Sequence, residues 1–261
     1  MINDLPIGVF DSGVGGLTVL EELKKMMPNE DYIYVADQGN CPYGTKSDEE
    51  IKKCVINVVK FLCEQNVKAI VIACNTASNF INDIKKEITI PIFSVIEVTA
   101  DCAIKTTKNK RVGVIATNTT IKKGKYKTIL EKNKITSFNI PCSNFVEIVE
   151  ENRIDSPSTQ QIIDEKLIEL KNENIDTLIY GCTHFSLLEK PIKKVLENIN
   201  YISSGLPMRI KLSRYLAENN MLTTKNKNGF IKIYTTGDKE QAIKTMQWFK
   251  AEHNPVEKIN I

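Results

Sequence analysis

The sequence predicts an α/β protein composed of two units, each built on a parallel β-sheet and related to the other by approximate symmetry. Two observations predict this fold. Short apolar runs alternate with stretches of helical periodicity along the chain, a pattern typical of strands that helices cover on both faces. A set of motifs from the first third of the chain also recurs further along in the same order.

The apolar runs predict the strands. They lie near residues 6–10, 31–36, 68–73, 91–96, 111–116, 135–139, 176–181, 199–203 and 230–235. Helical spacing is clearest at 48–66, where one face carries Ile51, Val55, Val58, Val59 and Leu62. Because a strand, a helix and another strand follow one another repeatedly, we expect parallel strand pairing.

The internal repeat relates three features. IGVFD at 7–11 matches VGVIA at 112–116, with Gly8 and Gly113 separated by 113 − 8 = 105 residues. IACNTAS at 72–78 matches YGCTHFS at 180–186, with Cys74 and Cys182 separated by 182 − 74 = 108 residues. An apolar strand follows each cysteine motif, PIFSVI at 91–96 and INYISS at 199–204. We therefore expect a first domain of residues 1–97 plus 208–261 and a second of residues 98–207, with the C-terminal stretch packed on the first.

Composition narrows the class of protein. Of the 261 residues, 42% are hydrophobic and 26% charged, as in ordinary globular proteins. The net charge is only +3, and basic residues gather in short runs such as KTTKNKR at 105–111, so nucleic acid is not an expected partner. The chain opens on MINDLPIGVF without a secretory leader, and no apolar run approaches the roughly 20 residues that cross a bilayer. We expect a cytoplasmic protein with no membrane partner.

The seven cysteines are scattered at positions 41, 54, 63, 74, 102, 142 and 182, and none forms a C-x-x-C pair. This distribution supports neither a disulfide framework nor a structural zinc site. Reduced thiols and no bound metal are the expectation.

Cys74 and Cys182 stand where the chain leaves a strand and enters a helix. In open parallel sheets, ligands bind beyond the carboxyl ends of the strands, so two facing units would place one thiol on each side of a shared cleft. The following residues, in CNT and CTH, offer hydroxyl, amide and imidazole groups, and the starting helices would attract a carboxylate. Two opposed thiols suit racemisation, in which one base takes a Cα proton and the other returns a proton on the opposite face. His184 would assist or orient Cys182, and Asp11 would do the same for Cys74.

More than one interpretation of these residues stays open. Both cysteines are small enough to be inert core residues. Taken alone, His184 is at least as typical of a structural histidine as of a catalytic one. The Gly-rich DSGVGGLT at 11–18, with Asp37 after the next strand, has features of a dinucleotide-binding turn. However, Thr18 stands where the third glycine of G-x-G-x-x-G belongs. A tight turn whose amides hold a small substrate is the favoured interpretation.

The motifs together resemble those of the glutamate racemases, in the aspartate/glutamate racemase superfamily. The matching stretches extend from residue 7 to about residue 205. They are IGVFDSGVGGLTVL (7–20), PYGTKS (42–47), IVIACNTAS (70–78), IPIFSVIE (90–97), VGVIAT (112–117) and DTLIYGCTH (176–184).

The resemblance implies two flavodoxin-like domains related by a pseudo-twofold axis, with the active site in the cleft between them. It implies a homodimeric, cofactor-independent enzyme that interconverts L- and D-glutamate for peptidoglycan synthesis. Cys74 would act on the D-enantiomer and Cys182 on the L-enantiomer, supported by Asp11, His184 and Glu150. Substrate contacts would come from Asp11, Ser12, Tyr43, Gly44, Asn75, Thr76, Thr183 and His184.

Three stretches depart from the family pattern. ADQGNC at 36–41 replaces a run of the Gly-Asp-Thr-Ala-Arg type, with Asn40 in place of the arginine; Phe185 and Ser186 replace Tyr-Pro; and Ser203 and Ser204 stand where an aspartate is common. These departures leave open a racemase of the same design that acts on aspartate or another amino acid. Three further classes of protein also stay open: a thiol hydrolase or transferase using one cysteine with His184, a non-catalytic amino-acid-binding protein and a pyridoxal phosphate racemase.

Overall fold

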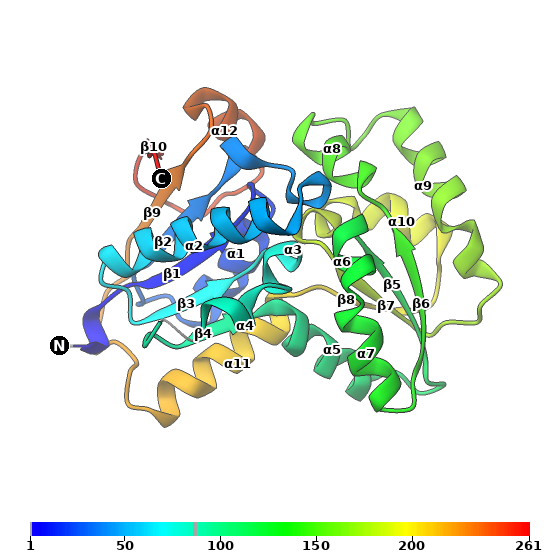
Figure 1. The fold of residues 1–261 in the computed structure, drawn as a ribbon, viewed down its shortest axis with the longest axis horizontal. Helices are drawn as coiled ribbons and strands as arrows, with labels where there is room; N and C mark the ends of the chain where they lie inside the picture. The colour runs from blue at the N-terminus through cyan, green and yellow to red at the C-terminus, as the bar shows by residue number, and fades with distance from the viewer. Residues whose placement is uncertain (1, 86–87) are drawn as a thin grey trace.

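The computed structural model of the chain, which describes residues 2–85 and 88–261, contains two parallel β-sheets in separate halves of the molecule (Figure 1). The first sheet has the strand order β10-β9-β2-β1-β3-β4, and the second has the order β6-β5-β7-β8. The strands of the first sheet are β1 (Ile7–Asp11), β2 (Tyr32–Ala36), β3 (Ala69–Ile72), β4 (Ile92–Ser94), β9 (Ile231–Thr235) and β10 (Glu257–Lys258). Those of the second are β5 (Arg111–Ala116), β6 (Thr136–Pro141), β7 (Thr177–Gly181) and β8 (Asn200–Ile202).

The predicted α/β class with parallel sheets is confirmed, and each predicted strand is present within a few residues of its expected position. Strand β10 was not predicted, because two residues are too few to leave an apolar run. The four strands β2-β1-β3-β4 have the same order as β6-β5-β7-β8, so the sequence repeat corresponds to a repeated flavodoxin-like topology. Strands β9 and β10 extend the first sheet beyond β2.

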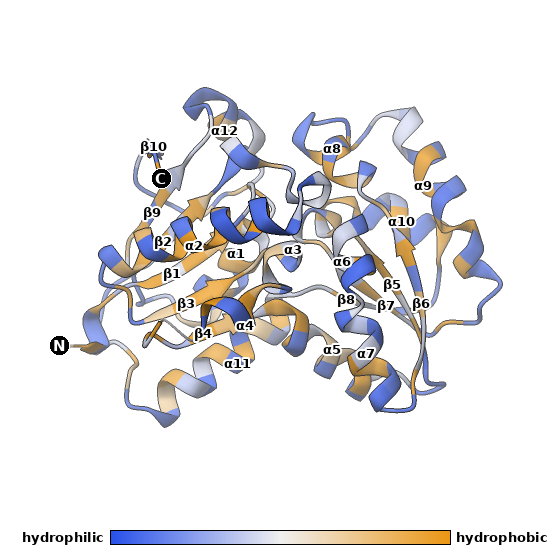
Figure 2. Cartoon of the chain, in the orientation of Figure 1, coloured by the Kyte–Doolittle hydropathy of each residue, from blue (hydrophilic) through white to orange (hydrophobic). Residues whose placement is uncertain are grey.

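Helices cover both faces of each sheet, as parallel strands require. In the first half, α1 and α11 pack on one face and α2 and α4 on the other. In the second half, α8, α9 and α10 cover one face and α5 and α7 the other. Figure 2 shows the result, apolar strands beneath helices that carry both hydrophobic and hydrophilic residues.

The helices have the following bounds: α1 (Leu17–Met26), α2 (Asp48–Glu64), α3 (Asn75–Ser78), α4 (Ile81–Ile84), α5 (Val95–Thr106), α6 (Asn118–Lys123), α7 (Lys125–Lys132), α8 (Asn144–Glu150), α9 (Pro157–Lys171), α10 (Glu189–Val195), α11 (Gly205–Glu218) and α12 (Lys239–Thr245). Short 3-10 turns complete the chain: η1 (Ile2–Asp4), η2 (Gln38–Asn40), η3 (Tyr43–Thr45) and η4 (Thr183–Leu188). The helix expected at 48–66 is α2, and Ser47 and Glu50 begin it with a reciprocal capping box. No helix in the described ranges is long and apolar enough to span a membrane.

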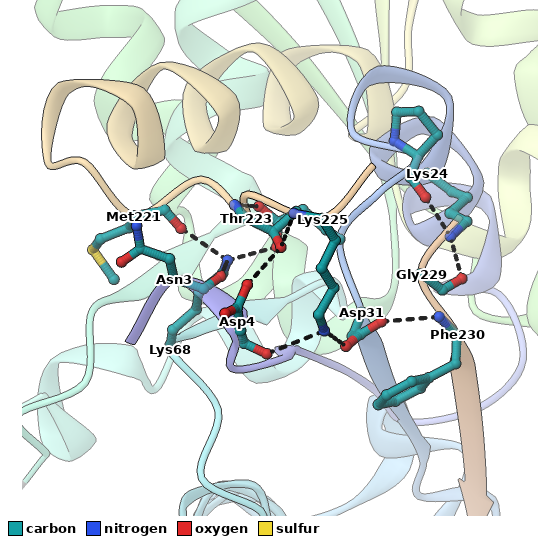
Figure 3. Close-up of polar contacts among 12 residues, drawn as sticks. Asn3, Asp4, Lys24, Asp31, Lys68, Met221, Thr223, Lys225, Gly229 and Phe230 are labelled. Carbon is teal, nitrogen blue, oxygen red and sulfur yellow. Dashed lines mark hydrogen bonds and ion pairs between the residues drawn. The ribbon is translucent and has the colours of Figure 1, made fainter. Parts of the chain in front are cut away.

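A polar cluster ties the C-terminal segment to the first sheet, at the edge where β1, β2, β3 and β9 begin (Figure 3). Lys68 Nζ donates to Glu30 Oε2 at 2.5 Å, to the Asn3 carbonyl at 2.6 Å and to the Met221 carbonyl at 2.8 Å. Three partners satisfy the three N–H groups of a fully buried ammonium, which otherwise strongly destabilises a fold. Because Met221 lies between α11 and β9, this cluster fixes the C-terminal segment on the sheet.

The residues singled out in the sequence lie at the carboxyl ends of strands in both sheets. Strand β1 ends at Asp11, β3 ends just before Ala73 and Cys74, and β7 ends just before Cys182. The expected domain boundaries at 97 and 207 fall within α5 and α11. We propose that these two helices carry the chain from one domain to the other.

Candidate active site

A small cavity joins the two halves of the molecule, and both Cys74 and Cys182 line it. Its volume is about 20 Å³, which is room for about one water molecule. The lining residues are Ser12, Pro42, Tyr43, Gly44, Cys74, Asn75, Thr76, Thr117, Val146, Cys182, Thr183 and His184. The repeat therefore brings its two cysteines to one place, as the expectation of facing units requires.

Cys74 is held at the start of α3, where its sulfur accepts the N–H of Ala77 at 3.5 Å. Its S–H donates to Ser12 Oγ at 3.4 Å. Burial raises the pKa of the Cys74 thiol to about 12, and the negative charge of Asp11 adds to the rise. Hydrogen bonds with Ser12 and Ala77 act in the opposite direction. The protonated thiol is thus the stable form of Cys74 at neutral pH.

On the other side, Cys182, His184 and Glu150 form a chain of contacts. Cys182 Sγ lies 3.7 Å from His184 Nδ1, and His184 Nε2 lies 2.7 Å from Glu150 Oε1. Burial by itself lowers the pKa of His184, but contacts with Cys182 and Glu150 outweigh burial and raise that pKa well above its ordinary value. Burial raises the pKa of Glu150, whereas hydrogen bonds from His184 and Gln38 hold it below its ordinary value. The pair of a buried His184 and a half-buried Glu150 is therefore an imidazolium and a carboxylate.

Asp11 is fully buried behind the cavity and does not line it. Its carboxylate accepts the Gly13 N–H at 3.0 Å and the Thr183 hydroxyl at 3.1 Å. Burial raises the pKa of Asp11 to about 6, against the opposing effects of His184 and these two hydrogen bonds. Among the described residues, Ser12 and Ala77 form the hydrogen bonds with the Cys74 sulfur. Asp11 therefore acts on that thiol through its charge.

The glycines that follow Asp11 allow the second half of the molecule to approach. A Cβ atom at Gly15 would lie 2.6 Å from His184 Nδ1 and 2.7 Å from Thr183 Oγ1. At Gly13, a Cβ atom would lie 2.8 Å from Glu150 Oε1. All three distances are shorter than real Cβ contacts, so a larger residue at either position would force the facing side chains to move. Side chains of the second half occupy the space beside this turn. Its glycines therefore allow the two halves to pack together and do not form a dinucleotide site.

Asn75 and Thr76 follow Cys74 into the cavity wall. Asn75 Oδ1 accepts the Tyr126 hydroxyl at 2.7 Å, while Asn75 Nδ2 is buried without a partner among the described residues. A buried amide left unpaired is costly, so a ligand acceptor would complete this site. Thr76 Oγ1 lies 2.9 Å from Thr117 Oγ1 in the second half.

Tyr43 and Gly44 reach the cavity from the 3-10 turn η3. The Tyr43 hydroxyl donates to the buried Asp37 carboxylate, and the Gly44 carbonyl accepts the Thr119 hydroxyl at 3.0 Å. The cavity wall formed by these two residues is therefore anchored on both sides, by Asp37 from the first half and by Thr119 from the second.

Of the residues expected at the site, all line the cavity except Asp11 and Glu150, which contact lining residues from behind. Sequence analysis missed Pro42, Thr117 and Val146. Thr117 was detectable, because it is the repeat counterpart of Ser12 (12 + 105 = 117). In the described part of the chain, no three His, Cys, Asp or Glu residues are grouped so as to hold a metal ion.

The residues that depart from the family pattern are not among the described residues that line the cavity. Phe185 is buried and packs edge-on against Phe145, with ring centroids 5.4 Å apart. Ser204 accepts the Thr99 hydroxyl at 3.2 Å. Gln38 and Asn40 donate to Glu150 and Asp37, respectively. These departures therefore lie outside the lining of the cavity.

Comparison with known proteins places the chain among amino-acid racemases. Residues 7–206 match the protein family described as Asp/Glu/Hydantoin racemase. The chain is 39% identical over 251 residues to a glutamate racemase from Thermoanaerobacter pseudethanolicus, which covers 95% of this chain and 94% of that protein. Two solved structures are also similar, with 99% of this chain and 98% of each of theirs covered. One is a glutamate racemase isoform from Bacillus anthracis (36% identity, TM-score 0.94). The other is a glutamate racemase from Francisella tularensis in complex with D-glutamate (35% identity, TM-score 0.92).

Proposed function

The chain belongs to the Asp/Glu/Hydantoin racemase family, and we propose that it interconverts L- and D-glutamate with two cysteine bases and without a cofactor. We further propose that it works in the cytoplasm and supplies D-glutamate for peptidoglycan synthesis. The observation that carries the proposal is that Cys74 and Cys182, from different halves of the chain, line one small cavity.

In the proposed reaction on L-glutamate, the Cys182 thiolate takes the Cα proton, and the bonding electron pair remains on the substrate as a carbanion. The Cys74 thiol then gives its proton to the opposite face of Cα, which yields D-glutamate. Cys182 ends as a thiol and Cys74 as a thiolate, so the reaction of D-glutamate begins from that state with the roles reversed. Atoms and charge balance without an added reactant.

The two sides of the cavity differ in a way that supports these roles. An imidazolium at His184, held by Glu150, presents its Nδ1–H to Cys182 and favours negative charge on that sulfur. The pKa of Cys74 is raised by burial and by the charge of Asp11, which keeps this sulfur protonated. Cys74 is therefore prepared to donate a proton, the role that it has in the reaction of L-glutamate, and His184 is placed beside Cys182, the sulfur that would accept one.

Water exclusion would contribute to the chemistry. Without an electron sink, the carbanion is stabilised by hydrogen bonds and charge, which act more strongly in a dry site. Glutamate is several times larger than the water molecule that the cavity accommodates, so the two halves must separate for the substrate to enter. The contacts that span them, Thr76 with Thr117 and Thr119 with Gly44, would loosen on opening and re-form around the substrate.

Glutamate is the substrate that the lining supports best. Cavity-lining residues match the motifs of the glutamate racemases, and the departures lie behind the lining. The buried Asn75 amide and the first turn of α3 offer donors for a carboxylate. Aspartate, with the same functional groups on a shorter side chain, is the competitor that the assay must include.

We also propose that the chain forms a homodimer through the outer face of α11. Leu206 and Ile210, one turn apart on this helix, are 43% and 52% exposed. Ile210 borders a cavity of about 510 Å³ between α5 and α11, whose rim also carries Lys211, Asp101 and Glu218. A twofold axis would bring these opposite charges together. Sedimentation should detect a dimer in the wild type and a monomer in Ile210→Glu; a monomeric wild type, or a dimeric variant, would contradict the proposal.

The test of function is to incubate the purified protein, freed of cofactors, with L- or D-glutamate in D₂O. Proton NMR would follow loss of the Cα signal, and circular dichroism would follow optical activity. We expect exchange and loss of optical activity from both enantiomers. Activity on aspartate alone would change the substrate, and binding without exchange would indicate an amino-acid-binding protein instead of an enzyme.

A second function is favoured by one observation. Cys182, His184 and Glu150 form the nucleophile, base and orienting carboxylate that a thiol hydrolase requires. A hydrolase would have no use for Cys74, whereas racemisation requires both sulfurs, so substitution of Cys74 separates the two functions.

A further inference from the structure

Asp37 is a buried carboxylate outside the proposed catalytic set, and hydrogen-bond donors surround it. It lies just beyond the end of β2 and is 1% exposed. Thr236 Oγ1 donates to its Oδ1 at 2.6 Å, and the Tyr43 hydroxyl donates to its Oδ2. Asn40 Nδ2 lies 3.0 Å from Oδ1. No ion pair involves Asp37 within residues 2–85 and 88–261, so its side-chain partners there are hydroxyl and amide donors.

The bond to Asp37 decides how Tyr43 meets the cavity. A phenol hydroxyl has one proton to donate, and the Tyr43 proton is directed at Asp37. The hydroxyl of Tyr43 is therefore engaged by a residue that does not line the cavity. The ring also packs against Phe10, with centroids 6.3 Å apart. Asp37 thus determines where this part of the cavity wall stands.

The same carboxylate joins the cavity wall to the C-terminal strand β9. Thr236 follows β9, and its hydroxyl, which donates to Asp37, also accepts the Gly39 N–H at 3.0 Å. A Cβ atom at Gly39 would lie 2.7 Å from the Thr236 carbonyl oxygen, so the turn lies directly against the strand. The C-terminal segment, which has no counterpart in the repeat, thereby supports residues 37–44 from behind.

This turn also reaches across to the second half. Gln38 Nε2 donates to Glu150 Oε2 at 3.0 Å, and the other oxygen of Glu150 contacts His184. Residues 37–44 thus carry both Tyr43 and Gly44, which line the cavity, and a contact to the carboxylate behind Cys182.

We propose that Asp37 is a positioning residue, which acts through Tyr43 and Thr236 to hold residues 37–44 in the conformation that binds substrate. The inference rests on the proposed function, since it assigns substrate affinity to the racemase site. Asp37 touches none of the reacting atoms, so its loss should affect KM more than kcat.

The test compares Tyr43→Phe and Thr236→Val, each of which removes one hydroxyl from Asp37 while keeping the side chain's shape. Tyr32→Phe and Thr245→Val are matched controls, because each removes a buried hydroxyl that donates to a backbone carbonyl outside residues 37–44. We expect each test variant to raise KM for glutamate about tenfold, the effect of one hydrogen bond to a charged group. Turnover should change less than about threefold on the same scale, and the controls should match the wild type.

A purely structural role predicts a different result, in which all four variants lower the melting temperature but leave KM unchanged when measured well below melting. That outcome would overturn the inference. Hydrogen–deuterium exchange of residues 38–45 gives a readout independent of activity, and faster exchange is expected in Tyr43→Phe than in Tyr32→Phe. Should the wild type fail to racemise glutamate, the proposed function falls, and unchanged exchange in Tyr43→Phe would still reject the anchoring by Asp37.

Discussion

His184 Nε2 lies 2.7 Å from Glu150 Oε1, at the end of the ring that faces away from Cys182. This contact makes the two sides of the cavity chemically different although they arise from a repeat. The sulfur of Cys182 faces an imidazolium, whereas the sulfur of Cys74 faces a serine hydroxyl and the charge of Asp11. The two sulfurs are therefore not equivalent: burial and the charge of Asp11 raise the pKa of Cys74, whereas Cys182 lies 3.7 Å from the ring of His184.

Substitution of either cysteine by serine tests the two-base mechanism. Racemisation should fall by about 10²–10⁴-fold in Cys74→Ser and in Cys182→Ser, the usual contribution of a general acid or base. Because one thiol remains in each variant, solvent exchange at Cα without inversion should persist for one enantiomer. Cys74→Ser should exchange L-glutamate, and Cys182→Ser should exchange D-glutamate, as measured by NMR in D₂O.

Cys63→Ser is the matched control, since Cys63 lies on α2 away from the cavity, and it should keep wild-type activity. Full racemisation by Cys74→Ser would contradict the two-base mechanism, whereas hydrolysis that survives in this variant would support the single-cysteine chemistry. Exchange of both enantiomers by one cysteine variant would contradict the assignment of one base to each face.

Glu150→Gln tests the origin of the imidazolium. The contact with Glu150 contributes to the raised pKa of His184, so its removal should lower that pKa. Activity that requires protonated His184 is present below this pKa and lost as pH rises through it. The alkaline limb of kcat/KM should therefore move to lower pH in Glu150→Gln. At neutral pH, kcat/KM should fall equally for both enantiomers, because L- and D-glutamate have equal free energies.

The control is Glu147→Gln, which changes an exposed carboxylate one turn earlier on the same helix. Its pH profile should match that of the wild type. An unchanged alkaline limb in Glu150→Gln would show that Glu150 does not set the protonation of His184.

Much of this site is predictable from the sequence, and the part that is not has a physical reason. Cys74 and Cys182 were found because the repeat places both at the carboxyl ends of equivalent strands, β3 and β7. Asp37 was considered only as a feature of a dinucleotide turn. Its contact with Thr236 joins residues 199 apart, and that of Gln38 with Glu150 joins residues 112 apart. No local pattern records contacts made by bringing distant loops together, so the supports behind the cavity required the structure.

Asp11→Asn should separate stability from activity. The pKa of Asp11 is raised to about 6 in the folded protein from about 3.9 in an unfolded chain. Between these values the folded state binds more protons, so ionising Asp11 at neutral pH destabilises the fold. We expect Asp11→Asn to raise the melting temperature at pH 7, with an advantage that shrinks as the pH is lowered to about 5, below the folded pKa.

The same variant should lose activity above about pH 6, where the wild-type carboxylate is ionised, because the amide removes the charge that acts on Cys74. Calorimetry and the racemisation assay on the same preparations would measure both effects. Lower stability at pH 7 together with normal activity would contradict the role given to this buried charge.

Gly15→Ala tests whether close approach of the two halves is needed for catalysis. The added Cβ atom would lie 2.6 Å from His184 Nδ1 and 2.7 Å from Thr183 Oγ1, so the ring must move away from it. A displacement of about 1 Å at a catalytic group lowers rates by about 10²-fold. We expect kcat/KM to fall by that order, with circular dichroism showing a folded protein, because the strain is relieved by separating the halves and not by unfolding either sheet.

Gly124→Ala is the contrasting variant, because Gly124 has a φ of 65° and open space around the position of a Cβ atom. Alanine in this left-handed conformation costs about 1 kcal/mol, so the melting temperature should fall while kcat/KM stays unchanged. If Gly15→Ala behaved in the same way, with lower stability and normal catalysis, the glycine turn would be a folding requirement and not the element that lets His184 reach its catalytic position.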